Sequence, residues 1–213
     1  MIEDKIRSVL EKLDIVPTDL ELYRVAFTHQ SYANEHHVQS NERLEYLGDA
    51  ILDFLVAEYL YNKFPNLPEG HLTRLRAKYV CANANSRYAI QIGLDQCLLL
   101  GRGEAEQGGK SKPSLLGDLL EAFLGAVYLD SGIDAVRKIL NSIVFPQISE
   151  GSNFFIDYKS HLQEYIQAES RLGVEYVLIK ETGPAHDKTF TVSVYHDHLK
   201  LGTGVGKSKK EAE

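Results

Sequence analysis

The sequence lacks a hydrophobic run long enough to cross a membrane, because no apolar stretch approaches the roughly 20 residues that a spanning helix needs. The first residues, MIEDKIRSVL, lack the basic start and apolar stretch of a secretory signal. Cysteine is scarce, and Cys81 and Cys97 show no metal-type spacing, so we expect both to be reduced packing residues. These absences predict a cytoplasmic protein without a membrane partner.

A basic excess is also missing, since the formal net charge is −7. Phosphate binding usually shows as a surplus of Lys and Arg, so the total argues against a general nucleic-acid binder. The distribution is uneven: residues 1–150 hold 21 acidic and 15 basic side chains, whereas residues 151–213 hold 9 and 8. The acidity therefore belongs mostly to the first part, as either a solvated surface or a metal site.

Up to about residue 147 the apolar residues recur at helical spacing, which predicts an all-α first domain over residues 1–148. We expect helices over residues 2–13, 42–61, 70–79 and 114–129, with breaks at the VPTD and FPNLPEG segments.

The pattern changes after the small, polar segment SEGSN, so we place a linker at residues 149–156. An amphipathic helix over about 157–171 is followed by two segments, VEYVLIKETG and KTFTVSVYHDHLKLGTGVG. The second has the two-residue alternation of a strand, with HDH as a hairpin turn. The segment KSKKEAE starts a closing helix. Residues 157–213 are thus expected to form a small α+β domain of helix, three antiparallel strands and helix.

The segment NERLEYLGDA carries three acids, Glu42, Glu45 and Asp49, at offsets that place them on one side of a helix. A second pair, Asp118 and Glu121, lies on another expected helix. If the two helices meet, their carboxylates form an oxygen cage suited to Mg²⁺. A cation between them would also offset their mutual repulsion.

The alternative interpretation is that these acids are the solvated face of amphipathic helices. Asp53 illustrates it, since it falls on the same stripe without needing a role. Two features favour the metal site. The acids are interleaved with dense apolar residues, and Gly48 stands inside the helix, where its cost suggests close approach by another part of the chain.

Two other patterns suggest different ligands. The segment GRGEAEQGGKS ends like a phosphate-binding loop, but Glu104 stands where the first glycine is required, so we expect no nucleotide cofactor. His29, His36 and His37 could suggest a transition metal, yet no cysteine or acid completes a recognisable spacing, and we interpret them as surface histidines.

The segment NERLEYLGDAILDF closely resembles the signature of the ribonuclease III family. FTHQSYANE precedes it, and PEGHLTRLRA and LLGDLLEAFLGAVYLDSG follow, in the family's order. The resemblance implies a metal-dependent endoribonuclease that hydrolyses double-stranded RNA, leaving 5′-phosphate and 3′-hydroxyl ends with short 3′ overhangs. It implies a homodimer that processes structured RNAs such as ribosomal precursors, with Mg²⁺ as cofactor and Mn²⁺ as a substitute.

The resemblance also assigns roles by position. It implies Asp49 and Glu121 as catalytic, and Glu42 and Glu69 as acids near the cleavage site with an orienting or RNA-contacting part. Tyr46 lies where the family usually has phenylalanine, on the surface that contacts a twin subunit. The implied metal ligands are Glu45, Asp49, Asp118 and Glu121.

The second domain resembles the double-stranded RNA-binding domain, which reads A-form duplexes by shape. The resemblance implies that the first helix and the GPAHDK loop face minor grooves and that lysines meet phosphates. The residues are Gln163, Glu164, His186, Lys207, Lys209 and Lys210. Because Glu213 comes about one turn into the closing helix, we expect a truncated last helix, with lower thermal stability and duplex affinity than an extended chain.

Two rival functions remain open at this stage. One is a duplex-binding protein that keeps the fold without catalysis, and intact acids at the matching positions favour the enzyme over it. The other is a helical scaffold with acidic faces, which would leave the second domain unexplained.

Overall fold

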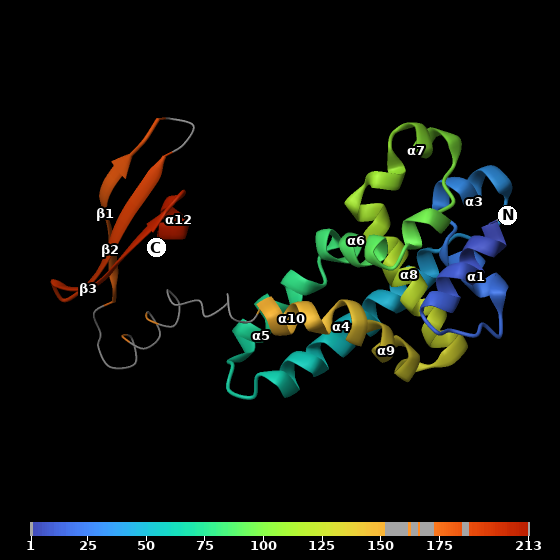
Figure 1. Cartoon of the computed structure of the whole chain (residues 1–213), viewed down its shortest axis with the longest axis horizontal. Coiled ribbons are helices and arrows are strands. Elements are labelled where there is room, and N and C mark those ends of the chain that lie inside the picture. Colours follow the sequence, from blue (N-terminus) through green and yellow to red (C-terminus); the bar gives the residue numbers. More distant parts are fainter. Residues whose placement is uncertain (1, 152–161, 163–165, 167–172, 185–187, 213) are drawn as a thin grey trace. The chain divides into compact units, whose positions relative to one another are not determined.

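The computed structural model describes residues 2–151, 162, 166, 173–184 and 188–212, and it divides the chain into two compact units, Met1–Glu150 and Gly151–Glu213. The first unit is helical and the second contains a small sheet (Figure 1). The mostly helical first unit and the three-stranded sheet of the second agree with the fold class that the sequence predicted. No helix in the described ranges is both long and apolar enough to span a bilayer.

The helices of the first unit include all four that the sequence pattern predicted, along with shorter ones that it did not delimit. They are α1 (Ile2–Lys12), α2 (Leu20–Ala26), α3 (Gln30–His36), α4 (Glu42–Lys63), α5 (Glu69–Tyr79), α6 (Ala82–Gln91), α7 (Arg102–Glu106), α8 (Pro113–Ser131), α9 (Ile133–Ile143) and α10 (Phe145–Gly151). Two 3₁₀ turns, Leu94–Cys97 and Gly109–Ser111, flank α7.

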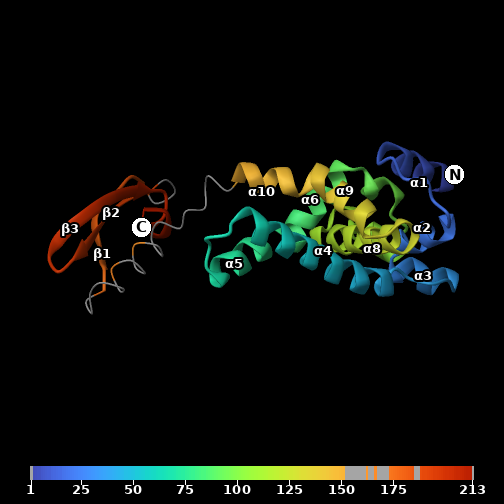
Figure 2. The ribbon, with the colours of Figure 1, turned by 90° about the horizontal axis from the view of Figure 1, so that it is seen from below.

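Helix α8 is the centre of the unit. Pro113 occupies its first turn, where a missing amide proton costs nothing, and Gly132 ends it with a positive φ of 82°. Most residues between Leu116 and Val127 are buried, so the helix is apolar on nearly all sides. Helices α4 and α6 pack most extensively against it (Figure 2). The acids of α8 therefore sit on an otherwise buried helix.

The aromatic side chains of Tyr23, Phe27 and Phe123 form one part of the core, and the ring centroid of Phe123 lies 6.0 Å from that of Tyr23 and 5.9 Å from that of Phe27. Asp130, near the end of α8, fixes the segment before α2. Its carboxylate accepts hydrogen bonds from the Thr18 amide (3.0 Å) and the Tyr23 hydroxyl (3.0 Å). These contacts hold the amino-terminal helices on the central helix.

Helix α10 continues past residue 149, where we expected the linker to begin. The rings of Tyr59 and Phe145 stack with centroids 4.0 Å apart, and the Tyr59 hydroxyl lies 2.8 Å from Ser149 Oγ. Ile148 is also buried. These contacts extend the helix to Gly151, and the rest of the expected linker lies outside the described residues.

The second unit contains β1 (Glu175–Thr182), β2 (Thr189–His196) and β3 (Leu199–Gly206) in one antiparallel sheet of order β1-β2-β3. Asp197 and His198, both with positive φ, form the tight turn expected at HDH. Helix α12 (Lys209–Ala212) packs on β3, where a Cβ on Gly204 would lie 2.1 Å from the Ala212 carbonyl oxygen. The expected helix over 157–171 falls almost wholly outside the described residues.

Candidate metal-binding and catalytic site

Three of the four acids expected to bind metal come together. Glu45 from α4 and Asp118 and Glu121 from α8 each offer a carboxylate oxygen, and these oxygens all lie within 4.8 Å of one another. All three side chains are half-buried. Two helices far apart in the sequence thus build one cluster of anionic oxygens.

Gly48 explains how the two helices come so close. A Cβ built on Gly48 would lie 1.7 Å from the main-chain carbonyl oxygen of Glu121, so no side chain fits at this position. The close approach inferred from a glycine inside the helix is confirmed, and the approaching part is the backbone of α8. Glu45 lies one turn before Gly48 on α4, which brings its carboxylate to those of α8.

The other expected acids, Asp49, Glu42 and Glu69, lie outside this group of three. Asp49 is exposed on α4, but it is near enough to raise the pKa of Glu121 and Glu45. Glu42 is exposed at the start of α4 and accepts a hydrogen bond from Ser40 Oγ (3.0 Å). Glu69 is exposed at the start of α5, where Thr73 Oγ1 donates to it (3.0 Å). Of the described acids, the closest group is therefore three-membered, and Asp49 borders it.

The clustered carboxylates disfavour one another's charge. Burial, aided by the nearby carboxylates of Asp49, Asp118 and Glu45, raises the pKa of Glu121 to about 8. Burial and the neighbouring acids, Asp118 first, also raise the pKa of Glu45. Burial raises the pKa of Asp118, while the charge of His29 opposes that shift. A cation among these oxygens would stabilise the charged forms.

The donor set fits a hard divalent cation. It consists of carboxylate oxygens alone, which suits Mg²⁺ or Mn²⁺ and not a soft metal that prefers thiolate. The three ligands leave room in an octahedral shell for water and phosphate oxygens. Glu45, Asp118 and Glu121 are accordingly the residues that could hold the metal.

Sequence reasoning missed Asn85, which lies in α6 and is fully buried. Its amide nitrogen donates to Glu121 Oε1 (2.8 Å) and to the Val80 carbonyl (3.1 Å). This bond lowers the pKa of Glu121 against the larger effects of burial and Asp49. The segment ANANSRYAIQ holds several polar residues, so nothing in the sequence singles out Asn85 for a contact with Glu121.

His29 and Cys81 differ from the sequence-based interpretation. His29 is half-buried and not a surface histidine, because it caps α3 by accepting from the Ser31 amide and lies near Asp118. Cys97 is buried, and burial raises the pKa of its thiol to about 11. Cys81 is exposed and precedes α6, so it is not a core packing residue.

Tyr46, expected at a subunit contact, is 82% exposed although α4 is otherwise well packed. It borders a groove of about 750 Å³ between α2, the start of α4 and the end of α8. Besides Tyr46, the apolar side chains that line the groove are Leu22, Val25, Leu44, Leu47 and Leu129, and its polar lining is Asp19, Glu21, Gln39, Glu42 and Arg43. Leu129 is itself 56% exposed, so part of the apolar lining of the groove is open to solvent.

In the second unit, Lys209 begins α12 and is exposed, as is Lys207 just after β3. Lys209 lies near Glu181 at the end of β1, and Glu181 also pairs with Lys188, the residue before β2. This places Lys209 near the end of β1. Gln163, Glu164 and His186 lie outside the described residues, as does the side chain of Lys210.

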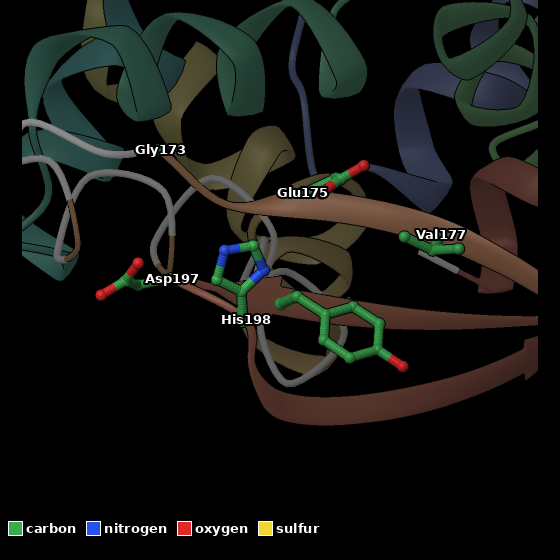
Figure 3. A pocket seen from close by; sticks show the side chains of 6 residues that line it. Gly173, Glu175, Val177, Asp197 and His198 are labelled. Atoms are coloured by element: carbon green, nitrogen blue, oxygen red, sulfur yellow. The ribbon is translucent and has the colours of Figure 1, made fainter.

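A pocket of about 430 Å³ lies at the opposite end of this sheet, between the start of β1 and the β2–β3 turn (Figure 3). Glu175, Tyr195, Asp197 and His198 line it. Its two carboxylates repel phosphate, so the pocket is unsuited to an RNA backbone.

Comparison with known proteins identifies both units. Residues 19–148 match a family model described as Ribonuclease-III-like, and residues 158–213 match the double-stranded RNA binding motif. The chain belongs to the ribonuclease III family. Curated relatives named Ribonuclease 3 include those of Bacillus cereus strain G9842 and Enterococcus faecalis, each 48% identical over 207 residues and 95% of this chain, with 84% and 90% of the relatives covered.

Solved structures agree with this membership. The nuclease domain of ribonuclease III from Campylobacter jejuni is 37% identical with a TM-score of 0.62, covering 65% of this chain and 95% of that one. Dicer from Pichia stipitis is 27% identical with a TM-score of 0.50, covering 92% of this chain and 89% of that one. The chain is a member of a metal-dependent family of endoribonucleases for double-stranded RNA, as its sequence predicted.

Proposed function

We propose that Glu45, Asp118 and Glu121, together with Asp49, are the catalytic centre of a Mg²⁺-dependent cut in double-stranded RNA. The observation that carries this proposal is the meeting of three carboxylates within 4.8 Å, on helices that the glycine at position 48 allows to touch. We assign residues 1–148 to the endonuclease domain and 157–213 to the duplex-binding domain.

Glu45, Asp118 and Glu121 would hold the cation, and Mn²⁺ would satisfy the same oxygen ligands. When bound, the cation would lower the pKa of a bound water and neutralise negative charge on the leaving 3′ oxygen. Asp49, which is exposed beside the cluster, would serve as a further ligand of the cation and as a catalytic residue. Glu42 and Glu69, also exposed, would act at the periphery by orienting the RNA backbone.

We further propose that two chains pair through the groove beside Tyr46. Its exposed ring and the apolar groove lie on the same surface, so a two-fold axis lets each Tyr46 enter the partner's groove. The Campylobacter jejuni structure is described as having a region involved in dimer formation, which supports pairing here. Such a dimer would carry two catalytic centres, one for each RNA strand. Together they would make staggered cuts in the duplex.

The duplex-binding domain would hold the substrate by shape and charge. Lys207, Lys209 and Lys210 would contact phosphates, while Gln163, Glu164 and His186 would face minor grooves. Because such contacts read A-form geometry more than base sequence, we expect structured RNAs such as ribosomal precursors among the substrates.

The test is incubation of the full chain with a perfectly paired RNA duplex, in Mg²⁺ or in EDTA, followed by gel shift and mapping of the product ends. We expect binding in both conditions and cleavage only with Mg²⁺, giving 5′ phosphates and short 3′ overhangs. Binding without cleavage in Mg²⁺ or Mn²⁺ would instead make the chain a duplex-binding protein.

A further inference from the structure

Asn85 is a fully buried carboxamide on α6, facing the central helix α8. Burying an amide is unfavourable unless its polar atoms find partners. An apolar side chain would pack in this position without that cost. The presence of an amide therefore calls for an explanation in its contacts.

Only the nitrogen of the Asn85 carboxamide makes hydrogen bonds in the described part of the chain. The amide nitrogen donates to Glu121 Oε1 at 2.8 Å and to the Val80 carbonyl at 3.1 Å, so both of its protons are used. If the carboxamide were flipped, its oxygen would face two acceptors, the Val80 carbonyl oxygen and Glu121 Oε1. That arrangement has no donor, so the side chain keeps the orientation described. Among the described residues, Asn85 Oδ1 has no hydrogen-bond partner. The side chain thus acts here as a donor alone.

The donor is held on a rigid support. The main-chain N–H of Asn85 donates a hydrogen bond to the Cys81 carbonyl oxygen (2.9 Å) in the first turn of α6. Close by, α6 packs against α8 at Gly117, where a Cβ would lie 3.3 Å from the Cα of Ala82. The distance between the donor and Glu121 is therefore set by two helices in direct contact.

We propose that Asn85 is a positioning residue for Glu121. By holding Oε1, it fixes the rotation of the carboxylate, so that Glu121 meets the cation in one orientation together with Glu45 and Asp118. Side chains that orient metal ligands in this way contribute to metal affinity without touching the metal. The inference rests on the proposed function, because it assumes that the cluster binds a divalent cation.

The test compares the full chain with Asn85→Leu, which branches at the same carbon but has no donor. Ser86→Ala is the matched control, since Ser86 is buried on the same helix and its hydroxyl bonds to the Asn83 carbonyl. Calorimetric titration of the metal-free proteins with Mn²⁺, without RNA, measures the affinity. We expect Asn85→Leu to weaken it about tenfold or more, while Ser86→Ala leaves it unchanged.

Cleavage gives a second readout. For Asn85→Leu the Mg²⁺ concentration at half-maximal cleavage should rise in parallel with the loss of Mn²⁺ affinity, with the KM for duplex RNA unchanged. If Asn85→Leu only lowers the melting temperature and binds Mn²⁺ as the parent does, Asn85 is a structural residue and the proposal is overturned. Failure of the parent itself to bind Mn²⁺ would reject the proposed function, and this inference with it.

Should Asn85→Leu fail to fold, Asn85→Ser removes the same amide without adding bulk and is judged by the same two measurements. Weaker Mn²⁺ binding by a folded Asn85→Ser supports the proposal, and unchanged binding overturns it.

Discussion

Gly48 and Gly125 face each other where α4 crosses α8. A Cβ on Gly48 would lie 3.0 Å from the backbone nitrogen of Gly125, and one on Gly125 would lie 3.3 Å from that of Gly48. The same two positions also abut the carbonyl oxygens of Glu121 and Leu44. Contact between the two backbones is thus the structural basis of the acidic cluster.

The first prediction follows from this crossing. Gly48→Ala forces α4 away from α8, so it should lower the free energy of unfolding by about 1–3 kcal/mol and abolish Mn²⁺ binding. Gly103→Ala is the control, because no atom lies within 4 Å of a Cβ there. Urea denaturation and Mn²⁺ titration measure both effects. A stable Gly48→Ala protein with parental Mn²⁺ affinity would refute the proposed role of the crossing.

Residues at this crossing also show how much of the site could be predicted from the sequence. The spacing of the acids and the presence of Gly48 predicted that two helices, α4 and α8 in the structure, meet with their carboxylates close together. Helical periodicity could not tell that Asp49 would stay exposed beside the group, because that depends on where along α4 the crossing falls. Asn85 was missed because its importance comes from a contact across the fold, 36 positions along the chain from Glu121.

Short elements were harder to foresee than long ones. Helices α2 and α3 have seven residues each and are held by caps and distant contacts, such as the Asp19 and His29 caps and the Asp130 carboxylate. Local pattern carries little of that information. The hairpin at Asp197 and His198 was readable because its turn chemistry is local.

The second prediction concerns pH. Because the pKa of Glu121 in the folded protein, about 8, exceeds its ordinary value of 4.5, the folded state holds a proton that the unfolded state loses between those values. The contribution of Glu121 to the free energy of unfolding is fully present below pH 4.5, and it is lost as the pH rises toward 8. In EDTA, urea denaturation should therefore show stability falling over this range, with a shallower fall for Glu121→Gln. Parallel profiles for the two proteins would contradict the shift.

The third prediction concerns the subunit contact. Tyr46→Ala removes the ring that we place in the partner's groove, and it should weaken dimerisation by about 2 kcal/mol or more, as for a central interface aromatic. Tyr61→Ala is the control, since Tyr61 is 72% exposed on the same helix but does not line the groove. Sedimentation equilibrium gives both dissociation constants, and equal values would argue for another interface.

The fourth prediction concerns duplex binding. Lys209→Glu should weaken affinity for RNA duplexes of any sequence and reduce the slope of log K against log salt by about 1. Lys200→Glu, on β3 beside the β2–β3 turn, makes the same charge change at the other end of the sheet. Filter binding across a salt series measures both. An equal loss for the two variants would point to net charge instead of a local phosphate contact.

The most direct test of the central claim is cleavage of a perfectly paired RNA duplex in Mg²⁺ by Glu121→Gln, beside the parent and Glu106→Gln, an exposed acid on α7. Gln keeps the size of the side chain and removes its charge. The account predicts that Glu121→Gln dimerises and binds duplex normally but cuts at least about a hundredfold more slowly, while Glu106→Gln cuts like the parent. Parental cleavage by Glu121→Gln would show that the carboxylate cluster is not the catalytic centre.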